Sequence, residues 1–120
     1  MSRVIHFEIP ADNPERAVAF YEKVFDWSIS KWEGPVDYWL ASTGPDDDPG
    51  IHGAITLRDH KGTTIAIEIP SVDEFTEKIV EAGGSVIVPK VPIPGIGYHA
   101  YCMDTEGNIF GIIESDPSAH

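Results

Sequence analysis

The sequence contains a single cysteine, Cys102, and therefore no internal disulfide. One cysteine suits a reducing compartment, and its place in an apolar stretch favours a small buried side chain over a nucleophile. No apolar run is long enough for a membrane-spanning helix. Because Met1-Ser2-Arg3 leads directly into a strand pattern, we expect no signal peptide and a cytoplasmic location.

Basic residues are also scarce, with 8 Lys and Arg against 20 Asp and Glu, which gives a net charge of −12. This charge repels phosphate backbones, so we expect no nucleic-acid partner. It is compatible with a cationic ligand, although acidity commonly serves only solubility. The sequence lacks a Ser-His-Asp arrangement, a phosphate-binding loop and a zinc knuckle. At 120 residues and 42% hydrophobic content, it predicts one domain with a real core.

Two hexapeptides are nearly identical: residues 5–10 read IHFEIP and residues 65–70 read IAIEIP, an offset of 60 residues. Each alternates apolar and other residues with period two, which is typical of a half-buried strand. His6 and Glu8 therefore share one face of the first strand, and Glu68 lies on the matching face of the second. The repeat indicates a chain built of two similar halves.

Each half shows the same order of elements. In the first, a strand over 5–10 precedes a helix that begins after Asp12 or Asn13, with Pro14 in its first turn and an apolar side. That side comprises Ala17, Phe20, Tyr21, Val24 and Phe25. Strands then follow over 27–32, 38–42 and 51–57, and residues 59–62 form a connector.

In the second half, Ser71 caps a helix that carries Phe75 and Ile79 on its apolar side and ends at Gly83-Gly84. Strands are expected over 65–69, 86–88, 98–103 and 109–114; residues 89–94 are so rich in proline that they predict an edge strand or a loop. The expected fold class is therefore α+β: two tandem βαβββ modules, residues 1–58 and 63–115, form a curled sheet around a shared concave pocket. The tail, residues 116–120, is expected to fray.

Two stretches carry a family resemblance: HFEIP with the following helix NPERAVAFYEKVFDW, and PGIGYHAYCMDTEGNIFGIIE near the end. With them the chain resembles the vicinal oxygen chelate superfamily, which includes glyoxalase I, bleomycin-resistance proteins and extradiol dioxygenases, and it looks like that superfamily's small glyoxalase-like proteins. The resemblance implies a homodimer and a small-molecule ligand. It supports a fold more strongly than a function.

Metalloenzymes of this superfamily take ligands from the first and last strands of each module. By resemblance these positions fall on His6, Gly53, Ala66 and Gly111, of which only His6 carries a donor side chain. A shift of one residue would replace Gly53 by His52. We therefore predict no cofactor, while a divalent metal in a rebuilt site of His6, Glu8 and Glu68 stays an alternative.

The candidate catalytic residues are His6, Glu8 and Glu68, because two carboxylates in a partly dry hollow can take separate acid and base roles. Each could equally be a pocket-lining group satisfied by neighbours. The candidate ligand-binding residues, on the paired third strands, are Trp39, Tyr98, His99 and Tyr101, with Tyr38 beside them. His52 and His60 resemble surface residues.

Three functions remain open. The first is a metal-free protein that binds a small organic molecule between its modules, as bleomycin-resistance proteins do. The second is a metal-dependent lyase, isomerase or dioxygenase of the glyoxalase type. The third is a metal-free acid–base enzyme that uses Glu8, Glu68 and His6.

Overall fold

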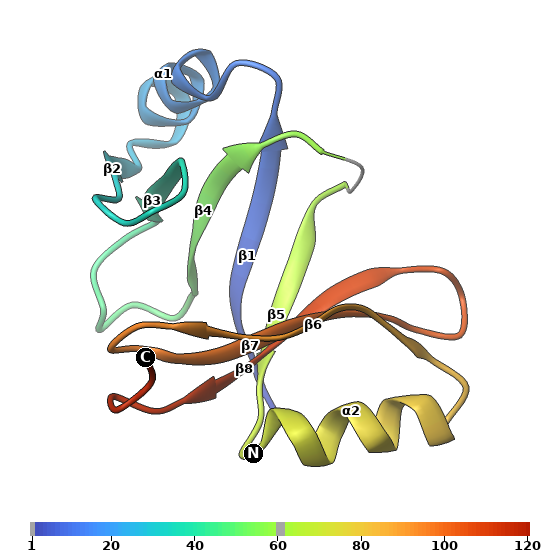
Figure 1. Ribbon diagram of the computed structural model, residues 1–120. Helices are drawn as coiled ribbons and strands as arrows, with labels where there is room; N and C mark the ends of the chain where they lie inside the picture. The colour runs from blue at the N-terminus through green and yellow to red at the C-terminus, as the bar shows by residue number, and fades with distance from the viewer. Residues whose placement is uncertain (1, 60–61) are drawn as a thin grey trace. The chain divides into compact units, whose positions relative to one another are not determined.

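The computed structural model describes residues 2–59 and 62–120, which form eight strands and two helices (Figure 1). His60 and Lys61 of the expected connector lie outside the described residues. The elements are β1 (Val4–Ala11), α1 (Pro14–Phe25), β2 (Ser28–Lys31), β3 (Tyr38–Ser42), β4 (His52–Leu57), β5 (Thr64–Glu68), α2 (Val72–Glu81), β6 (Ser85–Ile93), β7 (Gly97–Met103) and β8 (Ile109–Ser115). This is the expected α+β class with the βαβββ order twice, and the prediction is confirmed. Neither helix, within these residues, is long and apolar enough to cross a membrane.

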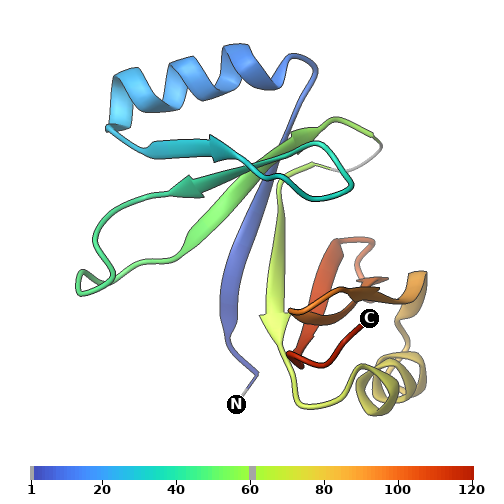
Figure 2. The same cartoon turned by 60° about the vertical axis from the view of Figure 1, so that its left-hand side comes forward.

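The chain divides into two compact units, which we describe separately. The first of these units, residues 6–64, contains the first βαβββ module except for the start of β1. Its strand order is β2-β3-β4-β1, with β1 parallel to β4 and the other pairs antiparallel. Helix α1 runs beside β2 (Figure 2) and packs against one face of these strands. We call that face the helix face and the opposite one the helix-distal face.

Local signals explain where α1 begins and ends. The side chain of Asn13 accepts a hydrogen bond from the Arg16 N–H, and Pro14, which lacks a donor, is the first helical residue. The helix ends at Asp26, whose φ of 61° is left-handed and whose N–H bonds to the Glu22 carbonyl. Asn13 is thus one of the two predicted caps.

The helix face of the first module is closed mainly by aromatic rings. Tyr21 stacks on Trp27 at a centroid distance of 4.8 Å, and Trp27 contacts Phe7 on β1 at 5.8 Å. Phe20 and Phe25, which the sequence places on the apolar side, remain 54% and 55% exposed. The expected burial of that side is therefore only partly realised: Tyr21, in its stack on Trp27, is half-buried, whereas Phe20 and Phe25 are exposed.

The second module, residues 1–5 with 65–120, repeats the topology as β5-β8-β7-β6, with β5 parallel to β8. The chain's beginning joins it, since the Glu68 N–H donates to the Arg3 carbonyl at 2.9 Å. Helix α2 packs against β6, β7 and β8 (Figure 1). Ser71 caps it by accepting the Glu74 N–H, as the sequence predicts.

A continuous apolar core lies under α2. Its buried members are Ile69, Val72, Ala100, Cys102 and Ile112, and Phe75 and Ile79 of the helix pack against them. Cys102 is fully buried, so its expected role as a small hydrophobe is confirmed. Burial raises the pKa of its thiol, which keeps it protonated and unreactive.

Two details concern the ends of the second module. The proline-rich segment belongs to β6, which is the edge strand and pairs with β7 through two register shifts, in agreement with the edge alternative. The expected fraying of the tail is wrong. Asp116 N–H donates to the Ile96 carbonyl, Gly95 N–H donates to the Ala119 carbonyl, and Ala119 is 4% exposed.

A candidate small-molecule site on the first module

Three side chains on the helix-distal face of the first module form a hydrogen-bonded cluster. Alternation on β1 places Phe7 on the helix face and His6 and Glu8 on the other. Tyr38, the first residue of β3, reaches both of them: its hydroxyl lies 2.7 Å from His6 Nε2 and 2.9 Å from Glu8 Oε2. Glu8 also accepts a longer bond of 3.5 Å from the Thr64 hydroxyl.

The bonding pattern fixes where the protons lie. A phenol has one proton, and Tyr38 donates it to the Glu8 carboxylate. The Tyr38 oxygen must then accept the bond from His6, so His6 carries its proton on Nε2. Nδ1 of His6 keeps a lone pair, and no residue within 2–59 and 62–120 bonds to it. The cluster therefore presents a basic nitrogen held in one tautomer by Tyr38 and Glu8.

Burial lowers the pKa of His6 below its ordinary value of 6.5, and the nearby Glu8 charge offsets this only in part. The imidazole is therefore neutral at neutral pH, which agrees with the proton placement above. A neutral imidazole can accept a proton from a ligand or bond to a ligand donor.

A hollow of about 370 Å³ lies next to the cluster. That volume falls within the range of small-molecule pockets. Serine hydroxyls from β2 and β3 supply most of its polar groups. The lining residues are His6, Ser28, Ser30, Leu40, Ala41, Ser42, His52 and Gly53. Among the described residues, the wall of the hollow thus offers hydroxyls and imidazoles without a carboxylate or an ammonium group.

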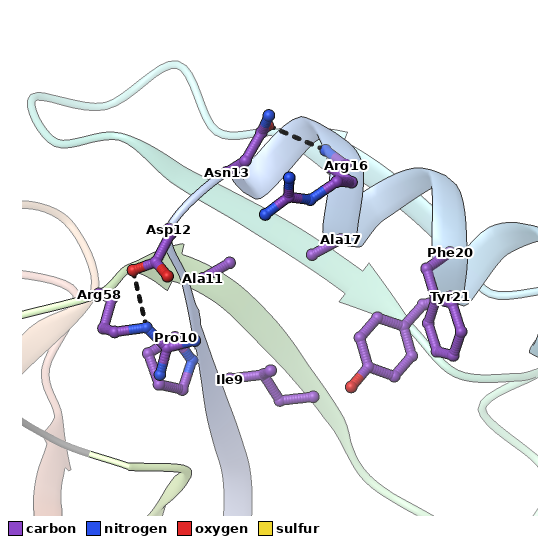
Figure 3. A pocket seen from close by; sticks show the side chains of 10 residues that line it. All are labelled: Ile9, Pro10, Ala11, Asp12, Asn13, Arg16, Ala17, Phe20, Tyr21 and Arg58. Carbon is purple, nitrogen blue, oxygen red and sulfur yellow. Dashed lines mark hydrogen bonds and ion pairs between the residues drawn. The ribbon is translucent and has the colours of Figure 1, made fainter.

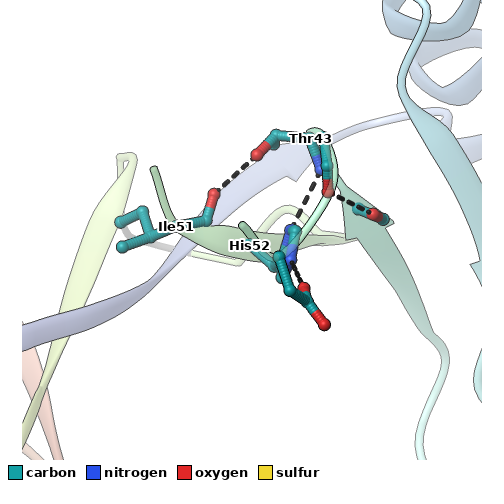
Figure 4. A network of polar contacts seen from close by, with 6 residues as sticks. Thr43, Ile51 and His52 are labelled. Carbon is teal, nitrogen blue, oxygen red and sulfur yellow. Dashed lines mark hydrogen bonds and ion pairs between the residues drawn. The ribbon is translucent and has the colours of Figure 1, made fainter. Parts of the chain in front are cut away.

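His52 lies beside His6 because β1 and β4 pair in that register. Its two nitrogens are occupied: Nδ1 accepts the Thr43 N–H at 3.1 Å, and Nε2 lies 2.8 Å from Asp46 Oδ1 (Figure 4). The Thr43 hydroxyl in turn donates to the Ile51 carbonyl at 2.8 Å. His52, whose side chain is 44% exposed, is therefore a surface histidine as expected, but one held in place in the wall of the hollow.

The same register corrects the assignment of the fourth-strand ligand position. Gly53 lies on the helix face, where an added Cβ would come within 2.5 Å of the Phe7 ring. The residue that shares a face with His6 is His52, the alternative that a shift of one residue allows. In the second module the register agrees with the predicted position, because Gly111 pairs with Ala66 and shares its face.

The residues at the four ligand positions do not fit a divalent metal. Ala66 and Gly111 carry no donor side chain, and His52 could bind a cation only by giving up one of its two hydrogen bonds. Across the described part of the chain, no group of three or more His, Cys, Asp or Glu side chains is arranged to hold a metal ion.

Three other predicted site residues share the helix-distal face of the second module. Glu68 and His99 both pair with Ile113, and Tyr101 pairs with Gly111. His99 and Tyr101 contact each other at 5.6 Å between ring centroids, and the Ser115 hydroxyl donates to Glu68 at 3.0 Å. The hydrogen-bond partner of the Glu68 carboxylate is thus a neutral hydroxyl group.

The structure corrects the placement of the remaining two predicted ligand residues. Trp39 alternates with Tyr38 and pairs with the buried Ile55, so it lies on the helix face, where the Lys31 ammonium sits 5.4 Å from its ring. Tyr98 packs against the core under α2, with Lys90 at 4.6 Å from its ring. Alternation along a strand explains both cases. Trp39 follows Tyr38 on β3 and Tyr98 precedes His99 on β7, so the two residues of each pair point to opposite faces.

The central residue of the cluster, Tyr38, is one of the strand aromatics of the sequence, but no local pattern indicates its role. Whether its side chain lies on the same face of the sheet as His6 depends on how β1 pairs with β4 and β3 with β4, and the sequence does not show these registers. No sequence pattern marks the serines of β2, because a single hydroxyl carries no signal by itself. Only the antiparallel pairing of Ser28 with Ser42 gathers them.

Comparison with solved structures supports the fold. A hypothetical protein from Bacillus halodurans C-125 has a TM-score of 0.73 at 16% identity, covering 99% of this chain and 98% of the other. Methylmalonyl-CoA epimerase of Streptomyces coelicolor, solved as an S115T variant with 2-nitronate-propionyl-CoA, has a TM-score of 0.72 at 17% identity, with 100% and 99% coverage. At these identities the likeness concerns the fold alone.

Sequence comparison identifies the family. CFP32, a candidate glyoxylase of Mycobacterium tuberculosis, is 28% identical over 117 residues, 92% of this chain; the chain spans only 43% of CFP32. A glyoxylase-like domain-containing protein of Didymella fabae is 26% identical over 115 residues, 88% of each chain. The family model of the Glyoxalase/Bleomycin resistance protein/Dioxygenase superfamily matches residues 3–112. The chain therefore belongs to that superfamily.

Proposed function

We propose that the first module binds a small polar organic molecule in the hollow beside the His6–Tyr38–Glu8 cluster, without the metal quartet of the superfamily's metalloenzymes. The observation that carries the proposal is the pair of hydrogen bonds made by the Tyr38 hydroxyl, to His6 and to Glu8. They hold His6 in one tautomer, with Nδ1 left as an acceptor. The hydroxyls of Ser28, Ser30 and Ser42 supply further bonds for a ligand that carries both donors and acceptors.

The test is a thermal-shift screen of small carboxylic acids, polyols and ketones, combined with metal analysis of the purified protein. A binding ligand raises the melting temperature in a concentration-dependent way. In Tyr38→Phe the ring stays but the phenol that holds His6 in one tautomer is lost, so we expect the affinity for the ligand to fall about tenfold. Trp39→Phe, one residue away on the helix face, is the matched control and should bind normally.

Two results would contradict the proposal. One is stoichiometric divalent metal that disappears in His6→Ala, which would establish a metal site at this position. The other is equal loss of affinity in Tyr38→Phe and Trp39→Phe, because the two side chains lie on opposite faces.

The same cluster favours metal-free acid–base catalysis as a second candidate. A proton taken by His6 Nδ1 would create an imidazolium whose Nε2–H already points to Tyr38 and, through it, to the Glu8 carboxylate. This arrangement stabilises the charge that develops on the base. Transfer of solvent deuterium to carbon adjacent to a carbonyl, followed by NMR over a panel of small carbonyl compounds, would test it. Exchange that persists in His6→Ala would rule it out.

The homodimer expected from the family is also a proposal. Its support is the exposed apolar side of α1, where Phe20, Val24 and Phe25 are each more than half exposed. Sedimentation of the purified protein as a monomer would contradict it.

A further inference from the structure

A second hollow, of about 400 Å³, lies between α1 and the strands of the first module (Figure 3). It opens on the helix face, where Ala17 and Tyr21 point from the helix toward Ile9 on β1. None of the described residues lines both this hollow and the one beside His6. It is therefore a separate cavity that the proposed function does not use.

Comparison of the two helices, aligned at their caps, explains why this space exists. The fourth residue after the Asn13 cap is Ala17, whereas the fourth residue after the Ser71 cap is Phe75. Phe75 packs against the core of the second module, while Ala17 lines the hollow. A methyl group stands where the sister helix inserts a phenyl ring, and the difference in side-chain volume leaves a cavity.

The mouth of the hollow is cationic, although the chain as a whole carries a charge of −12. Two arginines, Arg16 and Arg58, contribute to its lining. Arg58 is neutralised by Asp12, with Nε 2.9 Å from Oδ1. Arg16 forms no ion pair within the described residues, and the position that matches it in α2 holds the acidic Glu74. One guanidinium without an ion-pair partner among the described residues therefore lines a cavity whose other walls include Ile9, Ala17 and Tyr21.

We infer that this hollow is a second ligand site, for a small monoanion with an apolar or aromatic body, such as an aryl-substituted carboxylate. The body would fill the volume that Phe75 fills in the sister module, against Ile9, Ala17 and Tyr21. The carboxylate would pair with Arg16, whose planar fork matches carboxylate geometry. The size of the cavity falls within the range of small-molecule pockets.

The test uses the full chain, isotopically labelled, titrated with 4-phenylbutyrate and separately with the uncharged 4-phenylbutanamide, and followed by amide NMR shifts. We expect saturable shifts around Ala17 and Tyr21, with none at Ser28 and Ser30 of the other hollow. The amide should bind about tenfold more weakly, because it cannot form the charge-assisted pair.

Three variants at the hollow and one control variant complete the test. Ala17→Phe copies the sister helix and should abolish binding, and Ala17→Leu provides a smaller filling residue if the phenyl variant fails to fold. Arg16→Gln should weaken carboxylate binding about tenfold and leave amide binding unchanged. Lys23→Gln, on the same helix but away from the hollow, is the control. The inference fails if the filled, folded variants bind as the original chain does, if acid and amide bind equally, or if no saturable shift occurs.

Discussion

The two modules share one topology but differ in how each helix meets its strands. Under α2 a continuous core includes the fully buried Val72 and Cys102. Under α1 the aromatic stack of Tyr21 on Trp27 closes only part of the interface, and a hollow remains beside Ala17. The polar cluster of His6, Tyr38 and Glu8 also belongs to the first module. A duplicated fold thus allows one copy to pack a continuous core while the other keeps hollows beside its helix and its polar cluster.

The largest expected effect compares two isoleucines that occupy the same place in the repeat. Ile69 is 4% exposed in the second module's core, so Ile69→Ala should lower the free energy of unfolding by about 3 kcal/mol. Ile9 is half-buried beside the hollow, so Ile9→Ala should cost only about 1 kcal/mol. Denaturant unfolding of both variants measures the difference. Equal losses would mean that the first module is as well packed as the second.

A smaller contrast is expected where the two helices end. After α2 the left-handed position is Gly83, with φ of 100°, and after α1 it is Asp26, with φ of 61°. Gly83→Ala should destabilise by about 1 kcal/mol, and Asp26→Gly should stabilise by up to about 1 kcal/mol. Thermal unfolding should therefore shift in opposite directions for the two changes. Shifts in the same direction would show that side-chain contacts, and not backbone strain, govern the caps.

The smallest effect concerns pH. Since burial lowers the pKa of His6 in the folded state, the unfolded chain binds more protons below about pH 6.5. The neutral imidazole of His6 therefore contributes fully to the free energy of unfolding above about pH 6.5. This contribution is lost as the pH falls below that value toward the lower pKa of the folded state. Unfolding free energies measured between about pH 7.5 and pH 5 should therefore drop less for His6→Gln than for the original chain. A parallel decline in both proteins would contradict the assignment.

Local features of the structure could be predicted because they depend on neighbouring residues. Asn13 and Ser71 cap their helices through bonds to N–H groups three residues ahead, and the proline-rich β6 lies at an edge because proline lacks the ladder donor. The position of the C-terminal tail, residues 116–120, was less predictable. The tail is held by Ile96 and Gly95, which are remote in sequence from the residues they bind.

The sequence by itself determined the two βαβββ modules, the helix caps and the shared face of His6 and Glu8, because alternation and capping act over a few residues. Only the tertiary structure decided that Tyr38 joins this pair, that His52 rather than Gly53 lies beside His6, and that Trp39 and Tyr98 point to the helix faces. Each of these depends on register between strands, and a shift of one residue reverses the face. The hollow beside Ala17 likewise depends on packing. The sequence shows a small side chain at this position, but only the tertiary structure shows that the space beside its methyl group stays unfilled.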